Sequence, residues 1–184
     1  MQISEGLQGL IDEMTEQFGA KSLYVVDIFA EPGADEEPSP TVILGMRDAE
    51  TPVLLAQKQA AQHLERASDQ KVTVEILTDP IDEANFIFDK YLRAYIATHG
   101  GIVTPVEADE RLGKLWITMD GGCSGCPSSI ATLKHGIERT LKKHLPWVDS
   151  VEALNEPVEP DFNIAVDFSI TDVTKPSSDT AGKE

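Results

Sequence analysis

The sequence predicts an α/β protein of the α+β type, divided into two small domains. Three observations support this prediction. The chain has 184 residues, which is room for one ordinary domain or two small ones. Apolar residues recur at helical spacing in four segments and form short runs rich in β-formers in others. The order helix, strand, strand, helix, strand occurs once before residue 78 and once after it.

The first half of the chain, residues 1–78, supplies five elements and contains no cysteine. Its first helix has an apolar face and stops before Gly19. The two strands that follow are separated by an acidic, proline-rich loop at 31–40. Pro52 opens the next helix, at a position where a missing N–H is tolerated. In order, we predict a helix at 5–18, strands at 23–29 and 41–46, a helix at 52–67 and a strand at 72–77.

The second half, residues 79–155, repeats this order. Its first helix has an apolar face that includes two tyrosines and ends at Gly100-Gly101, and Pro146 ends the second helix. We predict a helix at 80–98, an antiparallel hairpin at 102–107 and 112–119, a helix at 127–145 and a strand at 148–154. The last two strands should be parallel and joined by a right-handed crossover. The result is a three-stranded mixed sheet with both helices on one face.

The remaining residues, 156–184, form an acidic extension. Apolar side chains alternate there with polar ones, at Phe162, Ile164, Val166, Phe168 and Ile170. This period of two predicts a half-buried strand at 162–170. After Thr171 the composition predicts a disordered tail.

Composition and charge exclude several classes of partner. The net charge is −17, so nucleic acid is not expected as a partner, because phosphate contacts need clustered Lys and Arg. The apolar stretches are too short and too interrupted to span a bilayer, so no membrane is expected. The N-terminus lacks the features of a secretory signal, and a cytoplasmic location follows as the expectation.

The two cysteines, Cys123 and Cys126, are the candidate functional residues. They lie two residues apart in a glycine-rich loop, where two thiols can face one ligand. Cys126 directly precedes Pro127, the predicted start of a helix, and the positive end of a helix dipole lowers a thiol pKa and favours a bound anion. A disulfide scaffold would need more cysteines along the chain.

From these residues alone, three interpretations remain equally open: a redox dithiol, a zinc site shared between two chains, and an iron–sulfur site shared between two chains. A thioredoxin-like dithiol also lies between a strand and a helix, but the second half is too short for that fold. Four thiolates from two chains satisfy the tetrahedral preference of zinc. They also satisfy an iron–sulfur cluster, which usually takes four protein ligands.

From about Phe88 to Leu154 the chain resembles the NifU C-terminal (Nfu) family. The shared features are the C-x-x-C loop and the glycine and helix residues around it. In this sequence they read Tyr91-Leu92-Arg93, His99-Gly100-Gly101, Gly122-Cys123-Ser124-Gly125-Cys126-Pro127-Ser128-Ser129, Thr132-Leu133-Lys134, Gly136-Ile137-Glu138, Leu141, Pro146, Val148 and Val151.

The resemblance implies an iron–sulfur cluster scaffold or carrier, not an enzyme. It implies a cluster, [4Fe–4S], bridged between two subunits by Cys123 and Cys126 of each. The expected partners are therefore a second copy of the chain, in a homodimer, and apo iron–sulfur client proteins. Thiolates of a client would replace those of the carrier one at a time.

Several other features receive an interpretation. Residues 1–78 are interpreted as a diverged copy of the second half that lacks the cluster loop, because Met46 and Met119 end corresponding strands. On this hypothesis the first half binds clients or the partner domain.

The predicted helix at 127–145 has a basic patch, which fits either its C-terminal position or contact with acidic surfaces. His99 is expected to cap a helix, and His135 and His144 to lie on or near an outer face.

Overall fold

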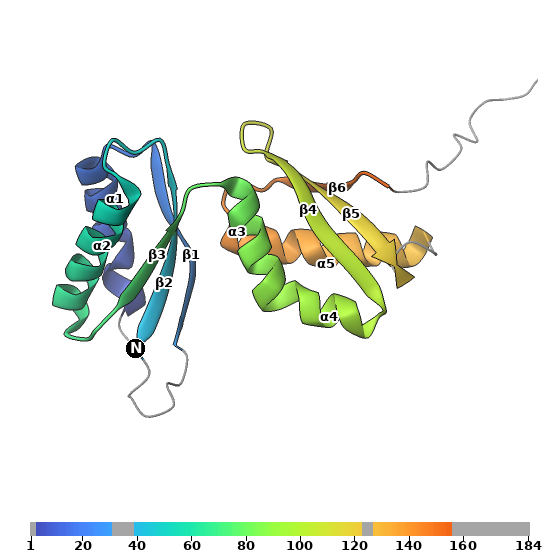
Figure 1. Cartoon of the computed structure of the whole chain (residues 1–184), viewed down its shortest axis with the longest axis horizontal. Helices are drawn as coiled ribbons and strands as arrows, with labels where there is room; N and C mark the ends of the chain where they lie inside the picture. Colours follow the sequence, from blue (N-terminus) through green and yellow to red (C-terminus); the bar gives the residue numbers. More distant parts are fainter. Residues whose placement is uncertain (1–2, 31–38, 123–126, 156–184) are drawn as a thin grey trace, which may run out of the picture.

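The computed structural model describes residues 3–30, 39–122 and 127–155. The first half contains a helix–strand–strand–helix–strand unit, in the order that the sequence predicts (Figure 1). Its elements are α1 (Ile3–Phe18), β1 (Ser22–Ala30), β2 (Pro40–Arg47), α2 (Val53–Ser68) and β3 (Thr73–Leu77). Thr78 and Asp79 connect this unit to the next.

The second half repeats the unit with one change in its first helix. The single helix predicted at 80–98 is divided into α3 (Pro80–Ile87), a π-helical turn η1 (Phe88–Leu92) and α4 (Arg93–Thr98). The remaining elements are β4 (Gly101–Asp109), β5 (Lys114–Gly121), α5 (Pro127–His144) and β6 (Ser150–Ala153). The last strand is thus shorter than the predicted 148–154. The strand predicted at 162–170 lies outside the described residues.

Both sheets have the same topology. The strand orders are β1-β2-β3 and β4-β5-β6. The first pair of each sheet is antiparallel and the second pair is parallel. The predicted parallel pairing of β5 with β6 is therefore confirmed, and so is the predicted fold class.

The likeness between the sheets extends to an irregularity in their ladders. Met46 pairs with Leu23 and Met119 pairs with Val103. In each ladder a β-bulge begins two residues after that partner, at Val25 in one and at Pro105 in the other. A bulge interrupts a ladder and twists a strand locally, so its position is a specific feature of a sheet. The two halves therefore share register as well as strand order.

Both helical segments before the first strand also end in the same way. Gly19 follows α1 with φ of +60°, and Gly100 follows α4 with φ of +66°. Two residues after each methionine, Asp48 and Gly121 again have positive φ. The left-handed region is uncommon for a non-glycine residue, and Asp is among the types that tolerate it. The Asp48 backbone is thus held in a conformation that glycine adopts at the corresponding place.

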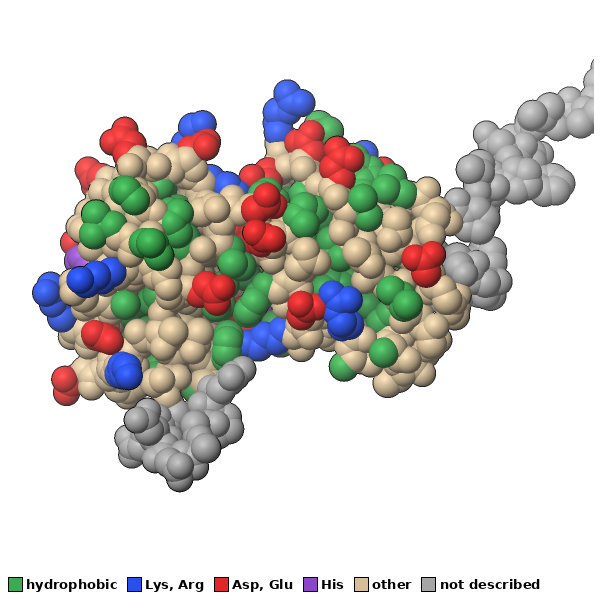
Figure 2. Space-filling model, viewed as in Figure 1, with side chains coloured by type: hydrophobic (Ala, Val, Ile, Leu, Met, Phe, Trp, Pro, Cys, Tyr) green, Lys and Arg blue, Asp and Glu red, His purple; other side chains and the backbone are tan. Residues whose placement is uncertain are grey.

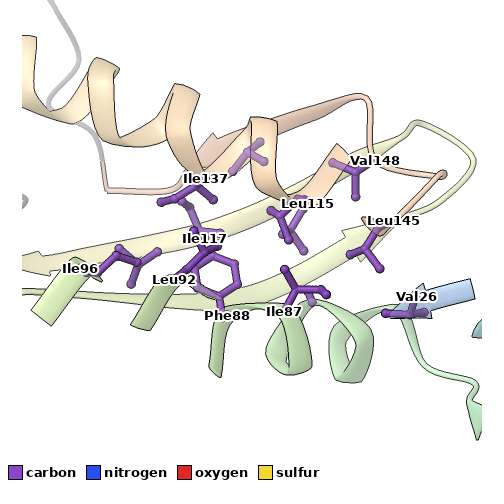
Figure 3. Close-up of a cluster of buried hydrophobic side chains, with 14 of the residues drawn as sticks. Val26, Ile87, Phe88, Leu92, Ile96, Leu115, Ile117, Ile137, Leu145 and Val148 are labelled. Carbon is purple, nitrogen blue, oxygen red and sulfur yellow. The ribbon is translucent and has the colours of Figure 1, made fainter. Parts of the chain in front are cut away.

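Two apolar clusters form the core. One lies between α1, α2 and the first sheet, around Phe18 and Leu44. The other fills the space between the second sheet and its helices, and it also includes Val26 and Ile43 of the first sheet (Figure 3). The first sheet is therefore covered on both faces. The predicted division into domains near residues 78–80 stays a prediction, because the halves share this second cluster.

The second sheet has helices on one face, as predicted. Val103, Leu115 and Ile117 point into the core, and each has an exposed fraction of 3% or less. On the opposite face Ile102 is 59% exposed and Val106 is 48% exposed. The side chains alternate because successive residues of a strand point to opposite faces.

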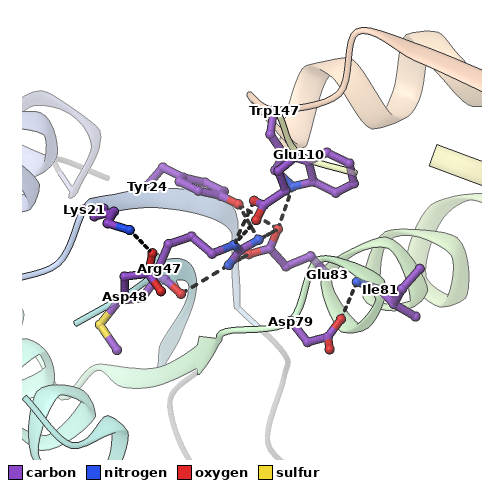
Figure 4. Close-up of polar contacts among 10 residues, drawn as sticks. Lys21, Tyr24, Arg47, Asp48, Asp79, Ile81, Glu83, Glu110 and Trp147 are labelled. Carbon is purple, nitrogen blue, oxygen red and sulfur yellow. Dashed lines mark hydrogen bonds and ion pairs between the residues drawn. The ribbon is translucent and has the colours of Figure 1, made fainter. Parts of the chain in front are cut away.

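A buried ionic cluster also joins the halves (Figure 4). Glu83 of α3 is fully buried and accepts hydrogen bonds from the Tyr24 hydroxyl at 2.7 Å and the Trp147 indole N–H at 2.9 Å. Arg47 of β2 lies 2.9 Å from the same carboxylate and 2.8 Å from Glu110. Burial is the largest cause that raises the pKa of Tyr24, and the negative charge of Glu83 is the next. The Tyr24 hydroxyl therefore stays neutral and can donate its hydrogen bond. The junction is thus fixed by polar contacts as well as apolar ones.

Candidate functional site

The two candidate cysteines, Cys123 and Cys126, fall within 123–126, outside the described residues. Both ends of that segment are described. Gly122 precedes it at the end of β5, and α5 begins directly after it at Pro127. The chain thus passes from the end of a central strand to the N-terminus of an 18-residue helix, where unpaired N–H groups favour anions.

A close backbone contact fixes the base of this loop. The Gly122 N–H donates to the Gly100 carbonyl oxygen at 2.8 Å. A Cβ built on Gly121 would lie 2.5 Å from that oxygen, and one on Gly122 would lie 2.4 Å from the His99 carbonyl oxygen. Only glycine allows such an approach, and Gly121 also has φ of +70°. The end of α4 therefore determines where the cysteine loop begins.

A groove of about 840 Å³ leads away from this point, between η1–α4 and α5. Its lining is mainly apolar and aromatic, and Tyr95 lies edge-on to His99, with ring centroids 4.9 Å apart. The lining residues are Tyr91, Leu92, Tyr95, His99, Gly122, Thr132, Leu133, Gly136, Ile137 and Thr140. The pattern of apolar residues along the sequence does not predict this groove. Two tyrosines four residues apart on a helix face, Tyr91 and Tyr95, were the signal available in the sequence.

One wall of the groove is held by the first half of the chain. Asp27 of β1, directly after the bulge, is 7% exposed and accepts from Lys90 Nζ at 2.6 Å and from the Tyr91 hydroxyl at 2.7 Å. Adjacent side chains of an α-helix point about 100° apart. Lys90 and Tyr91 belong to the π turn, which has a wider helical turn, and both reach one carboxylate. Asp27 thereby anchors the aromatic wall beside the cysteine loop.

His144 completes this contact, and its position differs from the prediction. It was expected on or near the outer face of its helix. Instead its ring stacks on Tyr91 at 4.8 Å, and Nδ1 lies 3.0 Å from the Val26 carbonyl oxygen. The helix periodicity places His144 correctly along α5, but it does not reveal that the first sheet covers this face. His99 follows α4 at its C-terminus, as predicted.

The contacts at this site shift the pKa values of both Asp27 and Tyr91. Burial alone raises the pKa of Asp27, but the hydrogen bonds from Lys90 and Tyr91 outweigh it and lower the pKa below its ordinary value. Burial, together with the bond to Asp27 and its charge, raises the pKa of Tyr91 to about 12. Near neutral pH the carboxylate is therefore ionised and Tyr91 is a hydrogen-bond donor.

We expect Asp27→Asn to reduce the free energy of unfolding by about 1.5–3 kcal/mol at pH 7, since bonds to a charged group are lost. The folded-state pKa of Asp27 is lowered, so its charge-linked stability is present above the ordinary carboxyl pKa. That stability is lost as pH falls through the lowered folded-state value. The variant should therefore lose less stability than wild type between pH 7 and pH 3 in urea titrations.

The matched control is Asp89→Asn in the same π turn, because Asp89 forms an exposed pair with Arg93. This control should behave like wild type. Equal acid sensitivity of Asp27→Asn and wild type would contradict the assigned role of Asp27.

The basic patch predicted on α5 is only in part available to a partner. Lys142 is paired with Glu138 at 2.6 Å. Arg139 and Lys143 are exposed, as is His135. Contact of this patch with acidic surfaces stays a prediction, and residues 31–38 of the acidic loop lie outside the described residues. On the face seen in Figure 2, acidic side chains are spread over both halves.

No alternative metal site is found among the described residues. Within 3–30, 39–122 and 127–155, no group of three or more His, Cys, Asp or Glu side chains could hold a metal ion. In the same ranges no helix is both long and apolar enough to cross a bilayer.

The fold and the loop together define a small α+β domain with a C-x-x-C pair between a central strand and a helix. Comparison with known families identifies it further. Residues 85–152 match the NifU-like domain, so this part of the chain is similar to that family.

Relatives of known name match the same part of the chain. The chain is 35% identical over 88 residues to "NFU1 iron-sulfur cluster scaffold homolog, mitochondrial" of Drosophila grimshawi, covering 46% of this chain and 29% of that one. It is 33% identical over 94 residues to "Fe/S biogenesis protein NfuA" of Pseudomonas syringae pv. tomato, covering 50% and 48%.

"NifU-like protein 2, chloroplastic" of Arabidopsis thaliana is 38% identical over 81 residues, covering 43% of this chain and 33% of that one. The chain thus spans less than half the length of these relatives. Their names describe scaffold and biogenesis proteins, not enzymes.

Proposed function

We propose that the chain is an iron–sulfur cluster carrier that binds its cargo through Cys123 and Cys126. The supporting observation is the placement of a C-x-x-C pair in a NifU-like domain whose relatives are named as cluster scaffold and biogenesis proteins. A thiolate-bound cluster is an anion, and the N-terminus of α5 favours negative charge.

The proposed cargo is a [4Fe–4S] cluster held between two subunits. Four cysteine ligands are usual for such a cluster, and one chain supplies two. A second copy completes the set by two-fold symmetry, which gives a homodimer with one cluster. Cluster loading should therefore convert a monomer into a dimer.

Transfer follows from the small number of ligands on each chain. A cysteine of an apo client protein attacks one iron and displaces Cys123 or Cys126, and the process repeats until the client supplies all ligands. The number of iron–thiolate bonds is conserved at each exchange, and no electron is transferred. Each displaced thiolate is stabilised at the helix N-terminus, which favours its release as an anion.

For residues 1–78 we propose descent from a copy of the same unit. The shared strand order, the corresponding bulges at Val25 and Pro105, and the positive φ at Asp48 and Gly121 support this proposal. The copy has no cysteine, and its second face packs on α3 and α5. Its proposed role is to fix the groove wall through Asp27 and to contribute to client docking.

The experiment is anaerobic reconstitution with iron and sulfide, followed by absorption and Mössbauer spectroscopy. We expect four irons and four sulfides per dimer. Zinc bound stoichiometrically by a colourless protein would contradict the proposal and favour a shared zinc site. A Cys123–Cys126 disulfide that cycles with a thiol reductant, without iron, would favour a redox dithiol.

Dimerisation gives a separate prediction. Sedimentation velocity should show a monomer for the apo protein and a dimer for the loaded protein at equal concentration. Chelation of the iron should return the dimer to monomer, because each chain supplies two cysteines and the cluster joins the two pairs. A loaded monomer with the full iron content would show that small thiols complete the coordination.

A further inference from the structure

The groove between η1–α4 and α5 exposes apolar surface of a kind that proteins normally cover. Tyr95 is 58% exposed and Tyr91 is 41% exposed. On the α5 side, a Cβ built on Gly136 would meet nothing within 4 Å, so the groove is open at the middle of the helix. Exposed concave apolar surface of this size is typical of binding sites.

Basic side chains border this groove on α5. His135, Arg139 and Lys143 are exposed and lie four residues apart, so they form one stripe along the helix. That stripe is adjacent in the helix to the groove-lining residues Gly136 and Thr140. In a chain with a net charge of −17, a basic border favours an occupant that combines apolar side chains with carboxylates.

The chain contains such a segment immediately after its last described residue. Residues 156–172 include five acidic residues and no Lys or Arg. Their apolar side chains alternate at Phe162, Ile164, Val166, Phe168 and Ile170. An extended segment with this pattern presents its apolar side chains on one side. Four of the five acids flank it, at 156, 159, 161 and 172.

The start of the segment is held close to the groove. The Asn155 side chain accepts from the Met119 N–H at 2.9 Å and donates to the Met119 carbonyl oxygen at 2.8 Å. Met119 is three strand residues from Gly122, the groove residue beside the cysteines, which is about 10 Å. Residues 156–161 can span up to about 20 Å, so Phe162 can reach the groove.

We propose that residues 162–170 of the same chain dock in the groove between α4 and α5, with the acidic residues that flank them at 156–161 near the basic stripe. If the proposed carrier function holds, the docked segment competes with the client for access to the cluster and slows its transfer. The docking itself does not depend on iron.

The test uses the full-length apo chain. Cys123→Ala and Cys126→Ala remove the only two cysteines, and Ala165→Cys then provides one site for a nitroxide spin label. We expect paramagnetic broadening of the NMR signals of Tyr95, Leu133 and Ile137. Broadening confined to the β4 or β6 edge, or none, would overturn the proposal. Broadening of an isotope-labelled chain by an unlabelled spin-labelled one would assign the occupant to a second copy and would also overturn it.

A groove-filling variant provides the second measurement. Gly136→Leu places its Cβ in open space, where nothing lies within 4 Å, and favours the helix by up to about 1 kcal/mol, so we expect folding to be retained. We expect it to abolish the broadening. Gly9→Leu in α1, where a Cβ also meets nothing within 4 Å, is the matched control and should leave the broadening unchanged. Broadening that survives Gly136→Leu would contradict docking in the groove.

The consequence for transfer is tested separately in the cluster-loaded wild type. Phe162→Asp should give faster transfer to an apo client, because the segment no longer docks. A chain that binds no cluster would refute the carrier function and leave the spin-label result standing. Unchanged transfer by Phe162→Asp would refute the regulatory consequence.

Discussion

Replacing Cys123 or Cys126 with alanine is expected to abolish cluster binding by the reconstituted protein. A cluster shared by two chains has four cysteine ligands, and a single substitution removes two of them from the dimer. Iron and sulfide content should fall to background, the brown colour should be absent, and the variant should sediment as a monomer.

Ser124→Ala is the matched control, because it lies between the cysteines and leaves both thiols in place. It should load iron like wild type. Because the described core lies outside 123–126, the cysteine variants should unfold at the wild-type urea concentration in the apo state. A cysteine variant with full iron content would show that other groups are the ligands.

The sequence predicts the elements of this fold well where apolar residues follow a clear period. β5 alternates buried and half-buried side chains as a strand with one covered face should. The strand order and directions of the two halves agree with the duplication hypothesis, which rested on element order and on Met46 and Met119. These features are local, or follow from short connections between neighbouring elements.

The contacts between the halves could not be predicted in the same way. Asp27 interrupts an apolar strand without a local partner, and Lys90 lies 63 residues further along the chain. The π turn that brings Lys90 and Tyr91 to Asp27 differs from an α-helix in that its hydrogen bonds span one more residue, which a pattern of apolar residues does not resolve. His144 was misplaced for a related reason, since its covering surface belongs to the other half.

The groove was missed because it depends on the spacing of two helices, not on either helix alone. Tyr91 and Tyr95 were recognised as part of an apolar helix face, yet both are exposed. Leu92 and Ile96 of the same segment are buried, as that interpretation requires. An apolar face wider than the core can cover indicates a second surface, and here that surface adjoins the cysteine loop.

Replacing Glu83 with alanine is expected to reduce the free energy of unfolding by about 3–5 kcal/mol, the largest effect at the junction. Removing one partner of a buried ion pair leaves the other charge without compensation. The Arg47 side chain is only 13% exposed, and it would lose its ion pair with Glu83 and keep the one with Glu110. The Trp147 N–H would lose its hydrogen-bond acceptor. Urea unfolding followed by circular dichroism would measure this loss.

Glu83→Gln separates the charge of this residue from its shape. The amide keeps the volume beside Gly45, where an added Cβ would lie 2.3 Å from the Glu83 carboxylate. The amide oxygen can still accept the hydrogen bond from the Trp147 N–H, but the amide no longer neutralises the charge of Arg47. The stability of the Glu83→Gln variant should therefore lie between those of wild type and Glu83→Ala. Lys21→Ala at an exposed pair is the control and should change stability little.

Trp147 also reports on the junction directly. Its indole contacts Glu83 in the folded state, so its fluorescence should change at the same urea concentration as the circular dichroism if the halves unfold together. Their shared core, which includes Val26 and Ile43, favours one transition in wild type. In Glu83→Ala, two separated transitions would show that the ionic cluster couples the halves. A single transition at the wild-type midpoint would show that the apolar contacts alone hold the groove wall against the first sheet.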